Sequence, residues 1–126
     1  MSDVAERGLV RQWHDLQALH AAVSGALEAR LQERHGIGVT EFEALEQLAT
    51  ADRKCRGTEL TEVVHLSQSA TSRLVARMER EGLVERSLCE DDRRGVFVNL
   101  TAAGRRRYDE AKPTHREVLA EVLARA

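Results

Sequence analysis

Hydrogen-bonding and basic side chains are concentrated in one short stretch, residues 67–77, of this aliphatic sequence. A helix over residues 68–81 would place most of them on the side opposite Leu74 and Met78. Such groups can pair with base edges in a DNA major groove or with phosphates. An ordinary solvated polar face is the alternative. The candidate DNA-contacting residues are Ser67, Gln68, Ser69, Thr71, Ser72, Arg73 and Arg77.

A charged hairpin tip, residues 90–95, follows between two expected strands at 84–89 and 96–100. Arg93 and Arg94 at such a tip can enter a narrow minor groove, where the negative potential is strongest. Asp92 is expected to orient a neighbouring arginine, with Arg77 or Arg94 as its partner. The hairpin therefore has the form of a DNA-binding wing, and a surface hairpin without function is the alternative.

Short helices must position these groups. Thr58 can cap a helix that runs to His65, and Ser67 can cap the next one, which gives the pattern of a helix-turn-helix. Before them, Gly36 and Gly38 are expected to end the first helix. A Thr-x-x-Glu capping box, Thr40 with Glu43, is expected to open a second helix over residues 41–51.

Apolar residues recur at steps of three and four along the first 35 residues, which predicts a long helix with one apolar stripe. Additional alanines and leucines favour contact with a second copy of the chain, and burial within one copy is the alternative. A second stripe marks a last helix, which Thr101 can cap and Pro113 is expected to kink. The residues expected at a dimer interface are Leu9, Trp13, Leu16, His20, Val23, Leu27, Val118 and Val122.

The elements predict one mainly α domain over residues 1–126 with a small β-wing. The expected order is helix, helix, a short strand near Cys55, helix, helix, strand, wing, strand, helix. The winged helix-turn-helix would occupy about 40–101, between dimerisation helices at about 3–35 and 101–125.

Charge is unevenly distributed around the net value of −2. Residues 1–52 carry four Arg against nine Asp plus Glu, a balance of −5, whereas residues 53–107 carry twelve Lys plus Arg against eight acids, a balance of +4. A basic central module on an acidic scaffold suits a protein that presents one face to a polyanion. No apolar stretch approaches the roughly 20 residues of a membrane span, and the N-terminus does not resemble a signal peptide, so a cytoplasmic location is expected.

Residues 66–84 read LSQSATSRLVARMEREGLV, followed by Asp92-Arg93-Arg94 and then by Leu100-Thr101-Ala102-Ala103-Gly104. This combination resembles the MarR (multiple antibiotic resistance regulator) family. An Asp-x-Arg wing followed at a fixed distance by Leu-Thr-x-x-Gly is a fairly specific signature, and the resemblance spans nearly the whole chain.

The resemblance implies a transcriptional regulator, most often a repressor, whose partners are double-stranded DNA and a second copy of itself. Its first and last helices would form a triangular homodimer on a pseudo-palindromic operator. Each recognition helix would enter a major groove, and each wing arginine, here Arg94, a flanking minor groove. Members usually have a further C-terminal helix in the interface, whereas the printed sequence ends at Ala126. Either the first and last helices suffice, or the dimer is weaker.

Family members are often released from DNA by a small molecule, a metal or an oxidant. The resemblance implies an effector pocket between the dimerisation helices and the winged module, and core or rim positions are the alternative for its candidate residues. These are Trp13, His14, His20 and His115.

Cys55 lies between Lys54 and Arg56 and could sense oxidants if these cations lowered its pKa. Two reduced thiols, Cys55 and Cys89, are the alternative. The short strand near Cys55 is expected to pair with residues 96–100, which would separate it from Cys89 by a strand and disfavour a disulfide. The spacing fits no metal site, and no cofactor or catalytic motif is present, which disfavours an enzyme. A winged helix that antagonises a related regulator without binding DNA is another class, and the wing arginines argue against it.

Overall fold

Helices make up most of the chain, and three short strands form one small sheet. The structure is a computed structural model that describes residues 1–88 and 95–125. Its elements confirm the predicted order of a winged helix-turn-helix with flanking helices. They are α1 (Asp3–His35), α2 (Val39–Thr50), β1 (Cys55–Arg56), α3 (Gly57–Val64), α4 (Gln68–Arg80), β2 (Val84–Leu88), β3 (Val96–Leu100), α5 (Ala102–Val118) and a π-helical turn, η1 (Leu119–Leu123).

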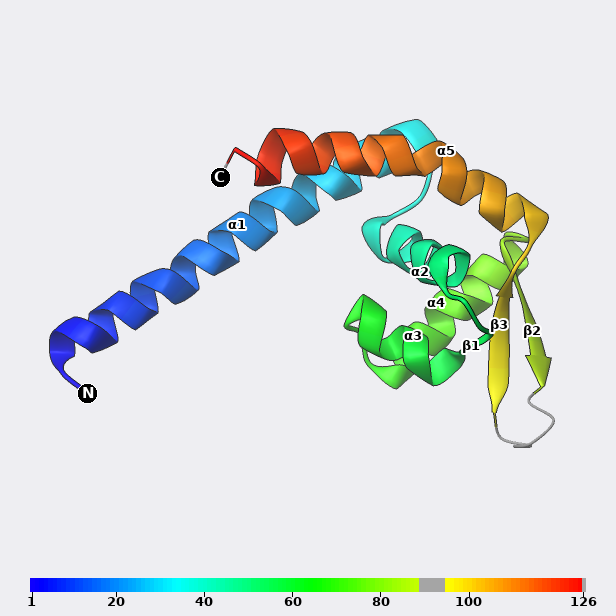
Figure 1. Ribbon diagram of the computed structural model, residues 1–126, viewed down its shortest axis with the longest axis horizontal. Coiled ribbons are helices and arrows are strands. Elements are labelled where there is room, and N and C mark those ends of the chain that lie inside the picture. The colour runs from blue at the N-terminus through cyan, green and yellow to red at the C-terminus, as the bar shows by residue number, and fades with distance from the viewer. Residues whose placement is uncertain (89–94, 126) are drawn as a thin grey trace.

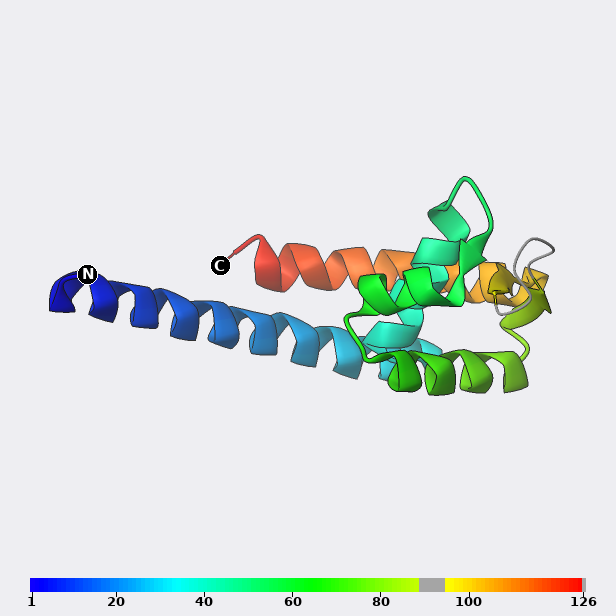
Figure 2. The same ribbon diagram turned by 90° about the horizontal axis from the view of Figure 1, so that it is seen from below.

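The long helix α1 projects away from the rest of the molecule over its N-terminal part. Figures 1 and 2 show α5 lying along the C-terminal part of α1, with α2, α3, α4 and the sheet grouped at the other end of α5. Residues 1–18 are all exposed, whereas Leu27 and Leu31 are buried. No helix in the described ranges combines the length and the apolar character that crossing a membrane requires.

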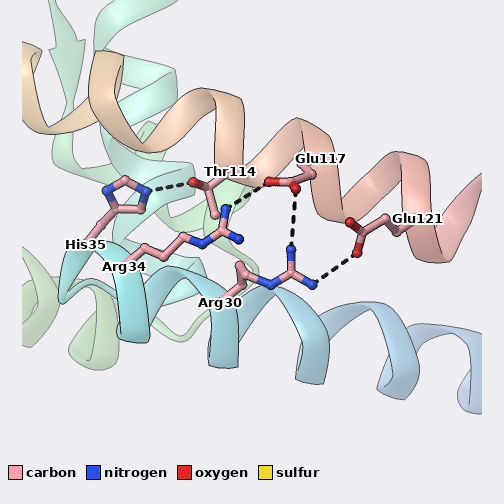
Figure 3. Close-up of polar contacts among 6 residues, drawn as sticks. All are labelled: Arg30, Arg34, His35, Thr114, Glu117 and Glu121. Carbon is pink, nitrogen blue, oxygen red and sulfur yellow. Dashed lines mark hydrogen bonds and ion pairs between the residues drawn. The ribbon is translucent and has the colours of Figure 1, made fainter.

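Ion pairs join α1 to the end of α5 and to the π-helical turn η1 that follows it (Figure 3). Arg30 lies 3.0 Å from a carboxylate oxygen of Glu121, and Arg34 lies 2.9 Å from one of Glu117. A 2.8 Å hydrogen bond joins the His35 ring to the hydroxyl of Thr114 one turn earlier on α5. These contacts fix how the two flanking helices lie against each other.

The start of α2 differs from its prediction, because the expected capping box of Thr40 and Glu43 is absent. The N-cap is Gly38, and the backbone N–H of Val39 donates instead to a carboxylate oxygen of Glu28 on α1, at 2.9 Å. A Cβ atom on Gly38 would lie 2.9 Å from the other oxygen of Glu28. A side chain distant in sequence therefore satisfies the helix start, and a local sequence pattern cannot reveal such a contact.

Helix caps elsewhere were predicted with mixed success. Thr58 lies inside α3 and does not cap it, because the N-cap is Arg56 without a side-chain bond. Ser67 and Thr101 cap α4 and α5 as predicted, accepting hydrogen bonds from Ala70 N at 3.1 Å and Gly104 N at 3.0 Å. As expected, Gly36 ends α1 in the left-handed region, with φ 67°.

The sequence Leu-Thr-x-x-Gly at the start of α5 has a structural cause. The Thr101 hydroxyl also donates to the carbonyl of Gly82 at 2.7 Å, so it ties α5 to the turn that follows α4. A Cβ atom on Gly104 would lie 2.1 Å from the backbone oxygen of Leu83. A glycine is required there because the backbones of α5 and that turn approach so closely.

The strands form an antiparallel sheet in the order β1-β3-β2. Cys55 pairs with Val98, and β2 pairs with β3 from Val84 opposite Leu100 to Leu88 opposite Val96. The predicted pairing of the strand near Cys55 with residues 96–100 is confirmed. The wing is thus anchored at its base to the helix-turn-helix through β1.

The core lies where α2 meets α5. Phe42 is fully buried, and its ring stacks on those of His115 and Tyr108 at centroid distances of 4.4 and 5.6 Å. Beside this stack, Glu46 accepts hydrogen bonds from Tyr108 at 2.9 Å and from Arg116. Burial disfavours ionisation of Glu46, but these two donors outweigh it and lower the pKa of its carboxyl.

Candidate nucleic-acid interface

The turn between α3 and α4 sets the start of the candidate recognition helix. His65 ends α3 in the left-handed conformation, with φ 56°, and Ser67 then caps α4. The chain thereby reverses within three residues, and α3 and α4 pack together. Figure 2 shows them side by side, with α4 along the edge of the molecule.

The exposed side of α4 carries most of the predicted DNA-contacting residues. Its buried stripe consists of Thr71, Leu74, Val75 and Met78. The exposed residues from the predicted set are Ser67, Gln68, Ser69, Ser72, Arg73 and Arg77. A row of small and hydrogen-bonding side chains along one helix face is the form that base recognition requires.

Thr71 corrects the prediction, because it is only 2% exposed and faces the core. Its hydroxyl donates to the carbonyl of Ser67 at 2.9 Å, so it belongs to the first turn of α4 and is not available to DNA. Ala70, one turn before Leu74, is only half-buried, and Thr71 and Val75 complete the buried stripe.

A groove of about 400 Å³ separates the start of α4 from the wing. Arg56 and Arg86 line it together with polar side chains from α3 and α4. These are Thr58, Thr61, Gln68 and Ser72. Arg86 also pairs with Glu79 at 3.3 Å. Cations beside neutral donors can hold a phosphate group, so this groove extends the candidate interface.

Three arginines of the interface were absent from the sequence-based set. Arg56 and Arg86 line the groove beside the wing, and Arg80 lies on the exposed face of α4, two turns after Arg73. Helical spacing could have revealed Arg80. Arg56 and Arg86 could not be found in that way, because the sheet brings them to α4.

The wing residues Asp92, Arg93 and Arg94 lie outside the described residues, as does Cys89. Their DNA contacts stay predictions. Within the described residues Arg77 pairs with Glu41, whose carboxylate oxygen lies 2.8 Å from its guanidinium. The pairing of Asp92 with Arg77 or Arg94 stays a prediction.

The predicted dimer interface divides into three groups by exposure. Leu9, Trp13 and Leu16 are 53%, 58% and 55% exposed, and His20 is also exposed. Leu27 and Val118 are 5% and 0% exposed, because they pack inside the chain where α1 meets α5, so they are core residues. Val23 and Val122 are half-buried at the margin of that core.

The predicted effector residues are not brought together. Trp13, His14 and His20 are exposed on α1, whereas His115 is buried against Phe42 on the inner side of α5. Three hollows among the described residues lie beside the wing, at the N-terminus of α1 and on the opposite flank of α4, and these three are lined by none of the four. An effector pocket at these residues stays a prediction.

Cys55 does not have the predicted lowered pKa. It is 3% exposed, and burial, together with the nearby charge of Glu59, raises the pKa of its thiol. Lys54 and Arg56 lie over the Phe97 ring instead, at 5.4 and 5.9 Å from its centre. A buried thiol with a raised pKa is a poor nucleophile, so these surroundings do not support the oxidant-sensor prediction.

Known proteins resemble both the helix-turn-helix and the flanking helices. Residues 35–95 match the family model described as MarR family. The DNA-bound crystal structure of Sco3205, a MarR family transcriptional regulator from Streptomyces coelicolor, is 30% identical to this chain and superposes with a TM-score of 0.83. The superposition covers 94% of this chain and 73% of Sco3205. The chain belongs to the MarR family.

Other known proteins are also similar to this MarR-family chain. CouR from Rhodococcus jostii RHA1, in its structure bound to p-coumaroyl-CoA, is 26% identical, with a TM-score of 0.75 over 84% of this chain and 73% of CouR. YdgJ of Bacillus subtilis (strain 168), an uncharacterized HTH-type transcriptional regulator, is 28% identical over 88% of this chain. The chain spans 65% of the length of YdgJ.

Proposed function

We propose that two copies of this chain bind a pseudo-palindromic operator and repress transcription by occupying it. In each copy α4 enters the major groove, with Gln68, Ser69 and Ser72 near the bases. Arg94 of the wing enters a neighbouring minor groove. The DNA-bound state of the relative Sco3205 supports this assignment.

The observation that carries the proposal is the distribution of charge and exposure on α4. The chain as a whole is acidic, yet the exposed side of α4 carries Arg73, Arg77 and Arg80. Its one acidic residue, Glu79, lies beside Arg86. A helix that concentrates free donors and cations on an acidic protein is suited to bind DNA at one defined surface.

The exposed N-terminal part of α1 supports assembly as a homodimer. Its apolar side chains, among them Leu9, Trp13 and Leu16, have no cover within the chain's described residues. A second copy that covers them would hold two α4 helices in a fixed relation, which recognition of two half-sites requires. A small-molecule signal that changes this relation is a further part of the proposal, by analogy with ligand-bound CouR.

The test is binding to the DNA upstream of the chain's own gene, measured by fluorescence anisotropy against a scrambled duplex of equal length. Gln68→Ala should change the preference between duplexes, while Gln17→Ala on α1 serves as the matched control. Arg94→Ala should weaken operator binding by about 1–3 kcal/mol and leave the fold intact. Equal affinity of the unmodified chain for both duplexes would refute operator recognition, and binding to neither duplex would favour a role as a protein antagonist.

A further inference from the structure

Three arginines surround a shallow hollow on the flank of α4 that faces away from the wing. The hollow measures about 340 Å³, and its seven lining residues include no acid. They are Thr40, Leu66, Ala70, Arg73, Leu74, Arg77 and Arg80. Three positive charges therefore meet at this surface with no acid among the lining residues. Such an arrangement is expected of a site that binds an anion.

Glu41 lies beneath this hollow. Its presence there is not explained by a contribution to the stability of the fold. Its side chain is 8% exposed and holds Arg77 through one oxygen, while the second oxygen is buried with no hydrogen-bond partner in the described residues. Burial, together with the nearby charge of Glu81, raises the pKa of the Glu41 carboxyl, although Arg77 and Arg107 oppose this. A half-satisfied buried carboxylate is costly to a fold.

When α4 lies in a DNA major groove, its two flanks face different DNA strands. The major groove is about as wide as an α-helix with its side chains, so a bound helix has the phosphates of one strand on each side. The groove lined by Arg56 and Arg86 lies on the wing side of α4. The hollow lined by Arg73, Arg77 and Arg80 lies on the other side.

We propose that Arg73, Arg77 and Arg80 bind a phosphate of the DNA strand opposite the wing, and that Glu41 is the positioning residue that holds Arg77 toward it. This rests on the proposed function. A guanidinium has five N–H donors in a planar fork, so a contact from one nitrogen to Glu41 leaves others for a phosphate. Fixing the side chain before binding reduces the entropy lost when the complex forms.

Glu41→Gln tests the proposal because the two possible roles of the carboxylate, repelling DNA or positioning Arg77, predict opposite changes in DNA affinity. If the carboxylate only repels DNA, its removal strengthens binding. If it positions Arg77, its removal weakens binding, by roughly five- to tenfold, and lowers the slope of log K against log salt by up to about 1. The probes are a duplex from upstream of the chain's own gene and a random-sequence duplex, and both should lose affinity alike, since phosphates carry no sequence.

Glu81→Gln is the matched control, because it removes the same charge from a neighbouring residue that forms no ion pair with a described residue. It should leave binding unchanged or slightly tighter. In a double-mutant cycle, Glu41→Gln should have no further effect once Arg77→Gln is present. The melting temperature of Glu41→Gln should be unchanged or higher at neutral pH, because the variant removes a penalised charge.

Unchanged or tighter DNA binding by Glu41→Gln would overturn the proposal. So would a loss of DNA affinity from Glu41→Gln that is as large in the Arg77→Gln variant as in the unmodified chain. Failure of the proposed function has a different result, because the unmodified chain itself would then show no preference for the upstream duplex, whether it bound both duplexes equally or neither.

Discussion

The two parts of α1 carry one apolar stripe in two different surroundings. At the helical repeat, Leu9, Trp13, Leu16, Leu27 and Leu31 fall on the same side of the helix. From Leu27 onward α5 and the core cover that side, whereas the earlier residues of the stripe are more than half exposed. The same sequence pattern therefore has two meanings, which only the position of α5 distinguishes.

The ion pairs of Figure 3 mark where the covered part lies. Arg30 and Arg34 reach Glu117 and Glu121 across the α1–α5 contact, while residues 1–18 approach no other element closely enough to be buried. Exposed apolar residues that share one helix side favour an interaction surface, so we expect its cover to come from outside the chain's described residues. A second copy is the cover that we propose.

Substitution of Leu27 should have the largest effect on the fold. Leu27→Glu buries an unpaired charge in the core between α1 and α5, so the free energy of unfolding should fall by on the order of 4 kcal/mol or more. Urea denaturation followed by circular dichroism measures this change. A folded, monomeric variant of normal stability would show that Leu27 belongs to the interface after all, as the sequence first suggested.

The sequence predicted the order of the elements well because each depends on local patterns. Ser67 and Thr101 cap their own helices, and the β-branched and aromatic side chains of residues 96–98 favour a strand. Predictions failed where a distant residue intervenes. Glu28 caps α2 in place of Thr40, and no local pattern records that contact.

The candidate site was predictable in part for the same reason. Helical spacing located the exposed face of α4. Which residues at the edge of that face turn toward the core depends on how the other elements pack against the helix. Thr71 was assigned to DNA because threonine is polar, yet its hydroxyl bonds to Ser67 and its methyl group suits the core. The environment of Cys55 likewise depends on the sheet and on Glu59, not on its neighbours in sequence.

Substitution of the exposed part of the stripe should change assembly without changing the fold. Leu16→Glu places a charge where we expect the second copy, so the dimer should dissociate while the helical content stays unchanged. Arg11→Gln is the matched control, because it changes the net charge by the same one unit on the opposite side of α1. Sedimentation velocity measures both. Equal sedimentation of Leu16→Glu and the unmodified chain would exclude this stripe from the interface.

A change of pH should have the smallest effect on the free energy of unfolding. It should act through His115, in the region that α5 covers. Burial against Phe42, aided by Arg116, lowers the pKa of His115, although Glu46 opposes this. The neutral ring is therefore favoured in the fold. The unfolded chain takes up this proton near pH 6.5, and the folded chain does so only at lower pH. Unfolding thus binds a proton in that window, and stability falls as the pH falls through it.

Urea midpoints measured on both sides of the ordinary histidine pKa should show this fall, and His115→Gln should reduce it. His14→Gln, in the exposed part of α1, should leave the fall unchanged, because that side chain lies in solvent in the single chain. The two histidine variants thus apply the comparison of covered and exposed regions to the same chemical group. If His115→Gln retained the full pH dependence, another group between α2 and α5 would have to account for it.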